Sequence, residues 1–96
     1  MTNDRFEAIC KKVVADYTNA HGDTTDKLPD LKPEEVYIVW MCKTLQNHKA
    51  LASTPRPDGM YYELTYNGDK DDLYVDAYKK FENKCISGVT LPDYVE

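Results

Sequence analysis

The sequence predicts an α+β fold, in which an N-terminal helix packs on a small antiparallel sheet of three to four strands. Apolar residues recur at spacings of three and four between residues 4 and 19, which is typical of one helix face. Two runs of alternating aromatic and polar residues flank Asn67-Gly68, a dipeptide typical of tight hairpins. The chain has 96 residues, of which 42% are hydrophobic, so we expect one small domain over residues 1–96. Its C-terminal tail is expected to be loose from about residue 87.

The first predicted element is a helix over residues 4–19. Thr2 or Asn3 can cap its N-terminus, and Gly22 suits the position after its C-terminus, because glycine readily adopts the left-handed conformation found there. A polar loop with two prolines follows. The apolar face of the helix is expected to pack on the core, and it consists of Phe6, Ile9, Cys10, Val13, Val14 and Tyr17.

Residues 36–42, which follow Pro33, form a dense apolar run that fits both a buried helix and a central strand. We favour the strand, because β-branched and aromatic residues pack well on a pleated surface. A turn at residues 46–48 then leads into a short strand over residues 49–53. Both faces of the first strand are apolar, so we expect it to be covered on both sides. One face would hold Val36, Ile38, Trp40 and Cys42, and the other Tyr37, Val39 and Met41.

The hairpin around Asn67-Gly68 is the centre of the predicted sheet. Its first strand covers residues 61–66, and both turn residues tolerate positive φ. Residues 73–82 fit a second strand, although a helix is the alternative because Leu73, Ala77 and Phe81 are spaced four apart. The local turn favours the strand. The loop length leaves the register open, and one register places Glu63 and Thr65 opposite Asp76 and Tyr78.

The chain is acidic, with a net charge of −5 and a sequence pI near 4.9. This balance argues against direct binding to nucleic acid, and it suits either solubility alone or a basic protein partner. The N-terminus lacks the apolar stretch of a secretory signal, and no apolar run approaches the length of a membrane span. Three widely spaced cysteines do not make a disulfide framework. We therefore expect a cytoplasmic protein with reduced thiols and no membrane contact.

Residues that could bind metal or carry out catalysis do not form a recognisable motif. The spacing of the cysteines and histidines matches no zinc site, and the acidic residues 69–76 do not match a calcium-binding loop. We expect two cysteines to be small core residues, the third to be exposed, and both histidines to be solvated. The sequence thus predicts no metal, no cofactor and no enzyme; the residues concerned are Cys10, Cys42, Cys85, His21 and His48.

Tyrosines are concentrated in the hairpin, where five of the eight are found. Because side chains alternate between the faces of a strand, some of them must point outward, although packing over a core explains the others equally well. Tyrosine is common at protein interfaces. The candidate partner-binding residues are Tyr61, Tyr62, Glu63, Asp69, Asp71, Asp72, Tyr74 and Tyr78.

Three segments carry a resemblance to known proteins: KTLQNHKALAST (43–54), DGMYYELTYNGDK (58–70) and YVDAYKKFEN (74–83). They resemble a family of short uncharacterised proteins from phages and prophages of low-GC Gram-positive bacteria. The resemblance transfers no activity. It implies a small phage-encoded protein in the host cytoplasm, and such proteins often inhibit a host or defence protein, including CRISPR effectors. We therefore expect a non-enzymatic inhibitor, with a small hydrolase or nucleotide-modifying enzyme, or a self-assembling structural protein, as alternatives.

Overall fold

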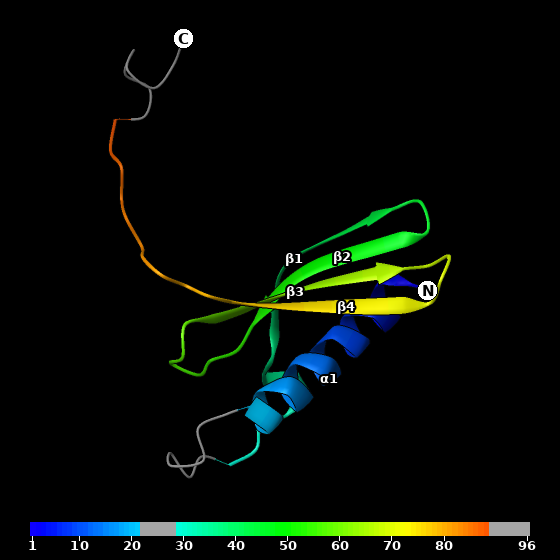
Figure 1. The fold of residues 1–96 in the computed structure, drawn as a ribbon, viewed down its shortest axis with the longest axis horizontal. Helices are drawn as coiled ribbons and strands as arrows, with labels where there is room; N and C mark the ends of the chain where they lie inside the picture. Colours follow the sequence, from blue (N-terminus) through cyan, green and yellow to red (C-terminus); the bar gives the residue numbers. More distant parts are fainter. Residues whose placement is uncertain (22–28, 89–96) are drawn as a thin grey trace.

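One long helix and a four-stranded antiparallel sheet make up the fold (Figure 1), which confirms the predicted α+β class. The computed structural model describes residues 1–21 and 29–88. The elements are α1 (Asn3–His21), the short 3-10 helix η2 (Pro33–Glu35), β1 (Tyr37–Thr44), β2 (Asn47–Ser53), β3 (Met60–Asn67) and β4 (Asp72–Lys79). Each strand pairs with the next one in the chain, so the sheet order is β1-β2-β3-β4.

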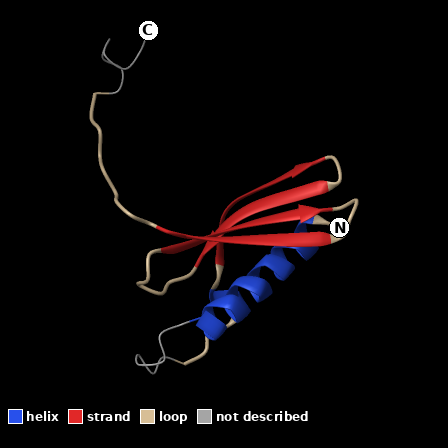
Figure 2. Cartoon of the chain, in the orientation of Figure 1, coloured by secondary structure: helices blue, strands red, loops and turns tan. Residues whose placement is uncertain are grey.

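Helix α1 lies against one side of the sheet (Figure 2). Its capping is as predicted, since Thr2 Oγ1 accepts a hydrogen bond of 3.2 Å from the Arg5 N–H. The predicted Gly22 end lies outside the described residues. In the sheet, the small side chains of Ala50 and Ala52 let the helix approach closely. The predicted apolar helix face is confirmed, although Ile9, Val13 and Tyr17 are only partly buried; the helix buries Phe6, Cys10, Val14, Ala15 and Thr18.

Strand β1 contains a bulge at Val39 that changes which residues share a face. Ile38 pairs with Ala52, but Trp40 pairs with Leu51, so Val39 is the extra residue. Val39 and Trp40 are both about half exposed, whereas Ile38 and Met41 pack against the core. The predicted division of β1 into two apolar faces, both covered, is therefore wrong. In the described residues the helix covers one side of the sheet, and the bulge moves Trp40 to the other side.

The turn between β1 and β2 consists of Leu45 and Gln46, since Thr44 pairs with Asn47. It comes earlier than the predicted turn at residues 46–48, because Asn47 and His48 already belong to β2. Leu45 has a φ of 56°, and its side chain is 86% exposed. A left-handed backbone conformation is unfavourable for leucine, and no burial offsets this cost.

We expect Leu45→Asn to raise the free energy of unfolding by about 0.5–1 kcal/mol, because asparagine tolerates the left-handed conformation better than leucine. Urea denaturation with an unchanged m-value measures this difference. Gln46→Asn is the matched control, since Gln46 has no positive φ, and its stability should stay close to that of the wild type. A Leu45→Asn variant that is less stable than the wild type would show that the leucine side chain contributes to packing.

The β3–β4 hairpin confirms the predicted strands, and residues 73–79 are a strand rather than a helix. In the observed register Glu63 is opposite Asp76, as in the register considered above, but Thr65 is opposite Tyr74 rather than Tyr78. Tyr78 is opposite Tyr61 instead. Residues opposite each other in an antiparallel pair share a face, so this register decides which tyrosines lie together.

The β3–β4 turn differs from the predicted Asn-Gly turn. Asn67 pairs with Asp72, which leaves a loop of four residues, 68–71. The positive φ of 55° belongs to Asp71, not to Gly68. Asn67 Oδ1 accepts a hydrogen bond of 3.1 Å from the Asp69 N–H and so stabilises the start of the loop. The expectation that the turn needs Gly68 in order to adopt a positive φ is therefore wrong.

Gly68 is required for a different reason, because the β3–β4 turn touches the β1–β2 turn. A Cβ atom at position 68 would lie directly on the carbonyl oxygen of Gln46. The Gly68 N–H also donates a hydrogen bond of 3.2 Å to Asn47 Oδ1. Glycine therefore permits a close approach between two neighbouring hairpins.

Residues 80–88, which we call the C-terminal arm, continue beyond β4 and run away from the sheet (Figure 1). The Lys80 N–H donates a hydrogen bond of 2.7 Å to the Gly59 carbonyl oxygen at the base of the arm. All nine residues are exposed. Ile86 is half exposed, so the described part of the arm does not pack onto the body of the protein.

Candidate functional site: the open face of the sheet

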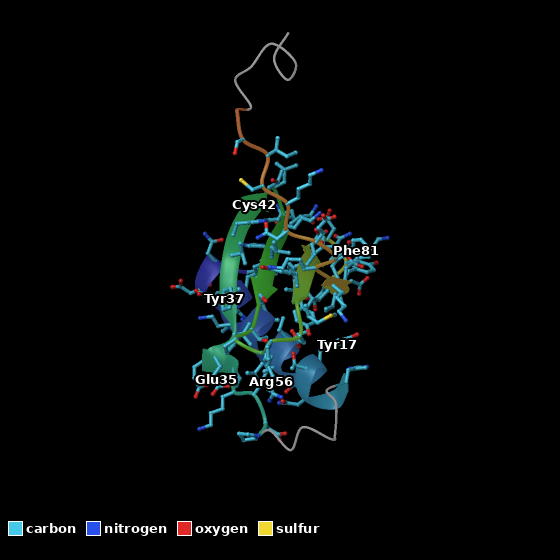
Figure 3. The ribbon with its side chains drawn as sticks, turned by 90° about the vertical axis from the view of Figure 1, so that its left-hand side faces the viewer. Tyr17, Glu35, Tyr37, Cys42, Arg56 and Phe81 are labelled. Carbon is cyan, nitrogen blue, oxygen red and sulfur yellow. The ribbon has the colours of Figure 1, made fainter. Side chains whose placement is uncertain are left out.

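The side of the sheet opposite α1 is uncovered in the described residues, and we call it the open face. The strand registers decide which residues belong to this face. The side chains that point to the helix are those of Ala50, Ala52, Tyr62 and Leu64, and the residues next to them along each strand point away from it. Figure 3 labels two residues of β1, Tyr37 and Cys42, whose pairing with Ser53 and Lys49 places them on this face. The open face consists of Tyr37, Val39, Trp40, Cys42, Lys49, Leu51, Tyr61, Glu63, Thr65, Tyr74, Asp76 and Tyr78.

Aromatic side chains dominate the exposed part of this face. Tyr37, Trp40, Tyr74 and Tyr78 have exposed fractions between 42% and 55%, and Tyr61 is half-buried beside Tyr78. Three of the predicted tyrosines thus share one face with two aromatic residues from β1. Sequence reasoning missed Tyr37 and Trp40, because they were assigned to opposite faces of a buried strand.

Tyr62 is a core residue and does not belong to the open face. It is 2% exposed, and its hydroxyl lies 3.4 Å from Thr18 Oγ1 of the helix. Its ring meets that of Tyr17 edge-on, with 5.6 Å between centroids. Burial raises the pKa of the Tyr62 hydroxyl, which therefore stays protonated at neutral pH. Its inclusion among the partner-binding candidates is corrected accordingly.

The charges on the open face are mainly acidic. Lys49 Nζ forms an ion pair of 3.0 Å with Glu63 Oε1, and the hydrogen bond to Glu63 raises the pKa of Lys49. Asp76 lies opposite Glu63 on the neighbouring strand. In residues 1–21 and 29–88, no ion pair involves Asp76. A single lysine therefore faces two carboxylates, and the face has a negative centre.

The three other predicted acids lie at one end of the open face, Asp69 and Asp71 in the β3–β4 loop and Asp72 at the start of β4. Asp69, Asp71 and Asp72 are exposed. Asp71 Oδ1 accepts a hydrogen bond of 2.7 Å from the Tyr66 hydroxyl, and this bond raises the pKa of Tyr66. The turn thus forms an acidic rim next to Tyr74, as the sequence predicts from their proximity in the chain.

The cysteines differ in environment. Cys10 belongs to α1 and is buried, and burial, followed by the nearby Glu7 carboxylate, raises the pKa of its thiol to about 12. It is unreactive at neutral pH, in agreement with its predicted core position. Cys42 is exposed, so its predicted core position is wrong; the bulge in β1 places it on the open face. Cys85, in the C-terminal arm, is exposed as predicted.

The two histidines also differ. His21 is exposed and stacks on Tyr17 with 4.0 Å between ring centroids. His48, however, is 2% exposed, so the prediction that it is solvated is wrong. The centroid of its ring lies 5.0 Å from that of Phe6 and 6.3 Å from that of Tyr66, and among residues 1–21 and 29–88 neither ring nitrogen has a hydrogen-bond partner. Burial, with smaller effects from Lys43 and the chain's amino terminus, lowers the pKa of His48.

Two hollows offer alternatives to the open face. One, of about 350 Å³, lies between residues 29–31 and 55–57 and is also lined by Glu35. Figure 3 labels two of its lining residues, Arg56 and Glu35. Arg56 Nη2 donates a hydrogen bond of 2.6 Å to the Pro29 carbonyl oxygen there. Its described lining residues supply two carboxylates, Asp30 and Glu35, but no thiol, hydroxyl or imidazole group. The other, of about 110 Å³, is a polar hollow beside His48 and Lys43.

No group of three or more Cys, His, Asp or Glu side chains in the described residues is arranged to hold a metal ion. Within the same residues, no helix is long and apolar enough to cross a membrane. The open face is therefore the surface with the clearest chemical character: aromatic side chains around a negative centre, bordered by an acidic turn.

Comparison with known proteins gives a family but no activity. Residues 7–88 match a family of unknown function, DUF6275. The matched segment begins in the first turns of α1 and ends with the C-terminal arm. No curated protein and no solved structure matches the chain. Because the match covers most of the 96 residues, the chain belongs to the DUF6275 family of unknown function.

Proposed function

We propose that the protein is a non-enzymatic binding protein that holds a protein partner with a basic surface on its open face. The exposed aromatic side chains on the uncovered side of the sheet carry this proposal: Tyr37, Trp40, Tyr74 and Tyr78. The resemblance to phage and prophage proteins suggests the class of partner. We propose a phage-encoded inhibitor that acts in the host cytoplasm on a host or defence protein, such as a CRISPR effector.

The aromatic content of the face supports a role in binding. An aromatic side chain that is half exposed still has a large apolar area to bury, and tyrosine and tryptophan provide this area with few rotatable bonds. Here they come from both edge strands, Tyr37 and Trp40 from β1 and Tyr74 and Tyr78 from β4. The face is therefore wide enough to provide several anchors in one interface.

The charges support a basic partner. Asp76 lies between Tyr74 and Tyr78 on the same face of β4 and has no ion pair in the described part of the chain. The turn with Asp69, Asp71 and Asp72 extends the negative surface, and the chain as a whole has a net charge of −5. A basic surface would be attracted to this face over a distance, and attraction of this kind increases the association rate.

We expect Tyr74→Ala or Tyr78→Ala to weaken partner binding by at least about 2 kcal/mol, mainly through faster dissociation, because each removes an anchor from the interface. Converting Asp69, Asp71 and Asp72 together to Asn should instead slow association, and high salt should slow the wild type in the same way. A triple variant with the same charge change elsewhere, Asp4→Asn, Asp30→Asn and Glu34→Gln, is the matched control and should associate faster than the turn variant.

The measurement starts from the partner itself. Two baits are used in lysate of infected cells: the wild-type protein and the double variant Tyr74→Ala, Tyr78→Ala. A protein that the wild type retains and the double variant does not is then purified. Rate constants are then measured for each variant at two salt concentrations, after circular dichroism has shown that the variants are folded. If the anchor variants and the acid variants bind the purified partner with wild-type rate constants, the open face is not the interface.

A further inference from the structure

We infer that the C-terminal arm of one copy docks on the open face of a second copy, so that two chains form a two-fold homodimer by exchanging arms. This inference goes beyond the proposed function and does not depend on it, because it concerns the protein alone. It rests on the apolar content of the arm, its direction, its charge and the character of the face that would receive it.

The arm exposes large apolar side chains that are not buried against residues 1–21 or 29–88 of their own chain. Phe81 is 99% exposed and Ile86 is 50% exposed, in a segment that is exposed throughout. A phenylalanine exposed to this extent loses the stabilisation that its burial would provide. The arm nevertheless belongs to the segment that matches the family, which ends at residue 88. Since the arm contributes little to the fold described here, a role outside its own chain explains its presence.

The direction of the arm allows it to reach a second copy of the protein. The hydrogen bond from Lys80 to Gly59 holds its base at the end of β4, and from there it runs away from its own sheet (Figure 1). Nine extended residues span about 30 Å, and an eight-residue strand such as β4 is about 27 Å long. The arm is therefore long enough to cross the whole open face of a second copy.

The arm and the open face are complementary. The arm carries Lys80 and Lys84 against one acid, Glu82, whereas the whole chain is acidic. The face offers Asp76, which has no ion pair in the described residues, between two half-exposed tyrosines. Phe81 would pack on these rings, and the net positive charge of the arm would be attracted to Asp76. Because each copy has both surfaces, a two-fold axis satisfies both contacts at once.

This arrangement has a consequence for partner binding. A basic partner with apolar groups has the same chemistry as the arm, so it would compete with the arm for the open face. The dimer would then be the form of the protein that exists without a partner. The two proposals remain separable, because dimerisation is measured on the purified chain alone and partner binding on a mixture.

The test is the molar mass of the purified full chain under reducing conditions, measured by sedimentation equilibrium from about 5 to 500 µM. The wild type is expected to be a dimer at the upper concentrations. Phe81→Asp should weaken dimerisation at least about tenfold, since it places a charge in the core of the contact. Tyr78→Asp should do the same from the side of the face. Leu45→Asp changes another highly exposed apolar residue, which lies outside the contact, and should leave the dimer intact.

Mixing the two defective variants distinguishes this arrangement from other dimers. Phe81→Asp retains a functional face and Tyr78→Asp retains a functional arm, so an equimolar mixture should form heterodimers that neither variant forms alone. Asp76→Lys replaces Tyr78→Asp if circular dichroism shows that the latter is unfolded. The inference is wrong if the wild type stays monomeric over the whole range, if Phe81→Asp dimerises like the wild type, or if the mixture does not associate.

Discussion

Gly68→Val is expected to lower the free energy of unfolding by at least about 2–3 kcal/mol, because any side chain at this position overlaps the neighbouring turn. The Cβ atom itself would meet the Gln46 carbonyl oxygen, which is backbone and cannot rotate away. To make room, the two hairpin turns would have to separate, and the hydrogen bond from the Gly68 N–H to Asn47 would be lost. Urea denaturation monitored by circular dichroism measures the change.

The size of the substituted side chain tests the cause. If the Cβ atom is responsible, Gly68→Ala should already cost most of the free energy that Gly68→Val costs. Lys70→Val places the same side chain in the same loop at an exposed position, and it should change stability by no more than about 0.5 kcal/mol. A tolerated Gly68→Ala variant would show that the turns are not in close contact in solution.

Acidification is expected to destabilise the wild type more than a His48→Phe variant. His48 is buried, both its ring nitrogens lack a hydrogen-bond partner in the described part of the chain, and burial lowers its pKa in the folded protein. The unfolded chain, with a histidine pKa of about 6.5, therefore binds a proton more readily than the folded one. The stability that the neutral imidazole contributes is fully present above about pH 6.5 and is lost as the pH falls below that value. Lys43 and the amino terminus act in the same direction.

Phenylalanine at position 48 removes both the unpartnered nitrogens and the titration. We expect His48→Phe to be more stable than the wild type by roughly 1–3 kcal/mol at pH 7, because two buried polar atoms no longer lack hydrogen bonds. The difference should grow as the pH is lowered to about 4.5. Urea midpoints across this range measure it, and His21→Phe is the control because His21 is exposed. Parallel stability curves for the wild type and His48→Phe would mean that folding does not lower the pKa of His48.

The individual elements follow from local patterns in the sequence. The helix is recognisable because Phe6, Cys10 and Val14 recur at helical spacing, and each of them is buried. The β3–β4 hairpin is recognisable because alternating aromatic residues flank a loop rich in Asn, Gly and Asp. These signals depend on residues close together in the chain, so no knowledge of the packing is needed to find them.

The candidate site could be predicted only in part. Tyr61, Tyr74 and Tyr78 lie on the open face as the alternation along their strands allows, and the acidic turn is exposed. Alternation places Tyr61 and Tyr62 on opposite sides of the sheet. It does not say which of these two tyrosines points toward the helix. That depends on the side of the sheet on which α1 packs.

By itself the sequence determined the class of the fold, the type of each main element and the concentration of tyrosines in one hairpin. Tertiary structure decided the rest. The bulge at Val39 moves Trp40 to the open face, and contact between two turns requires glycine at position 68. The helix and the neighbouring strands bury His48. Each of these features depends on contacts between residues that are distant in the chain. The periodicity of the sequence carries no information about such long-range contacts.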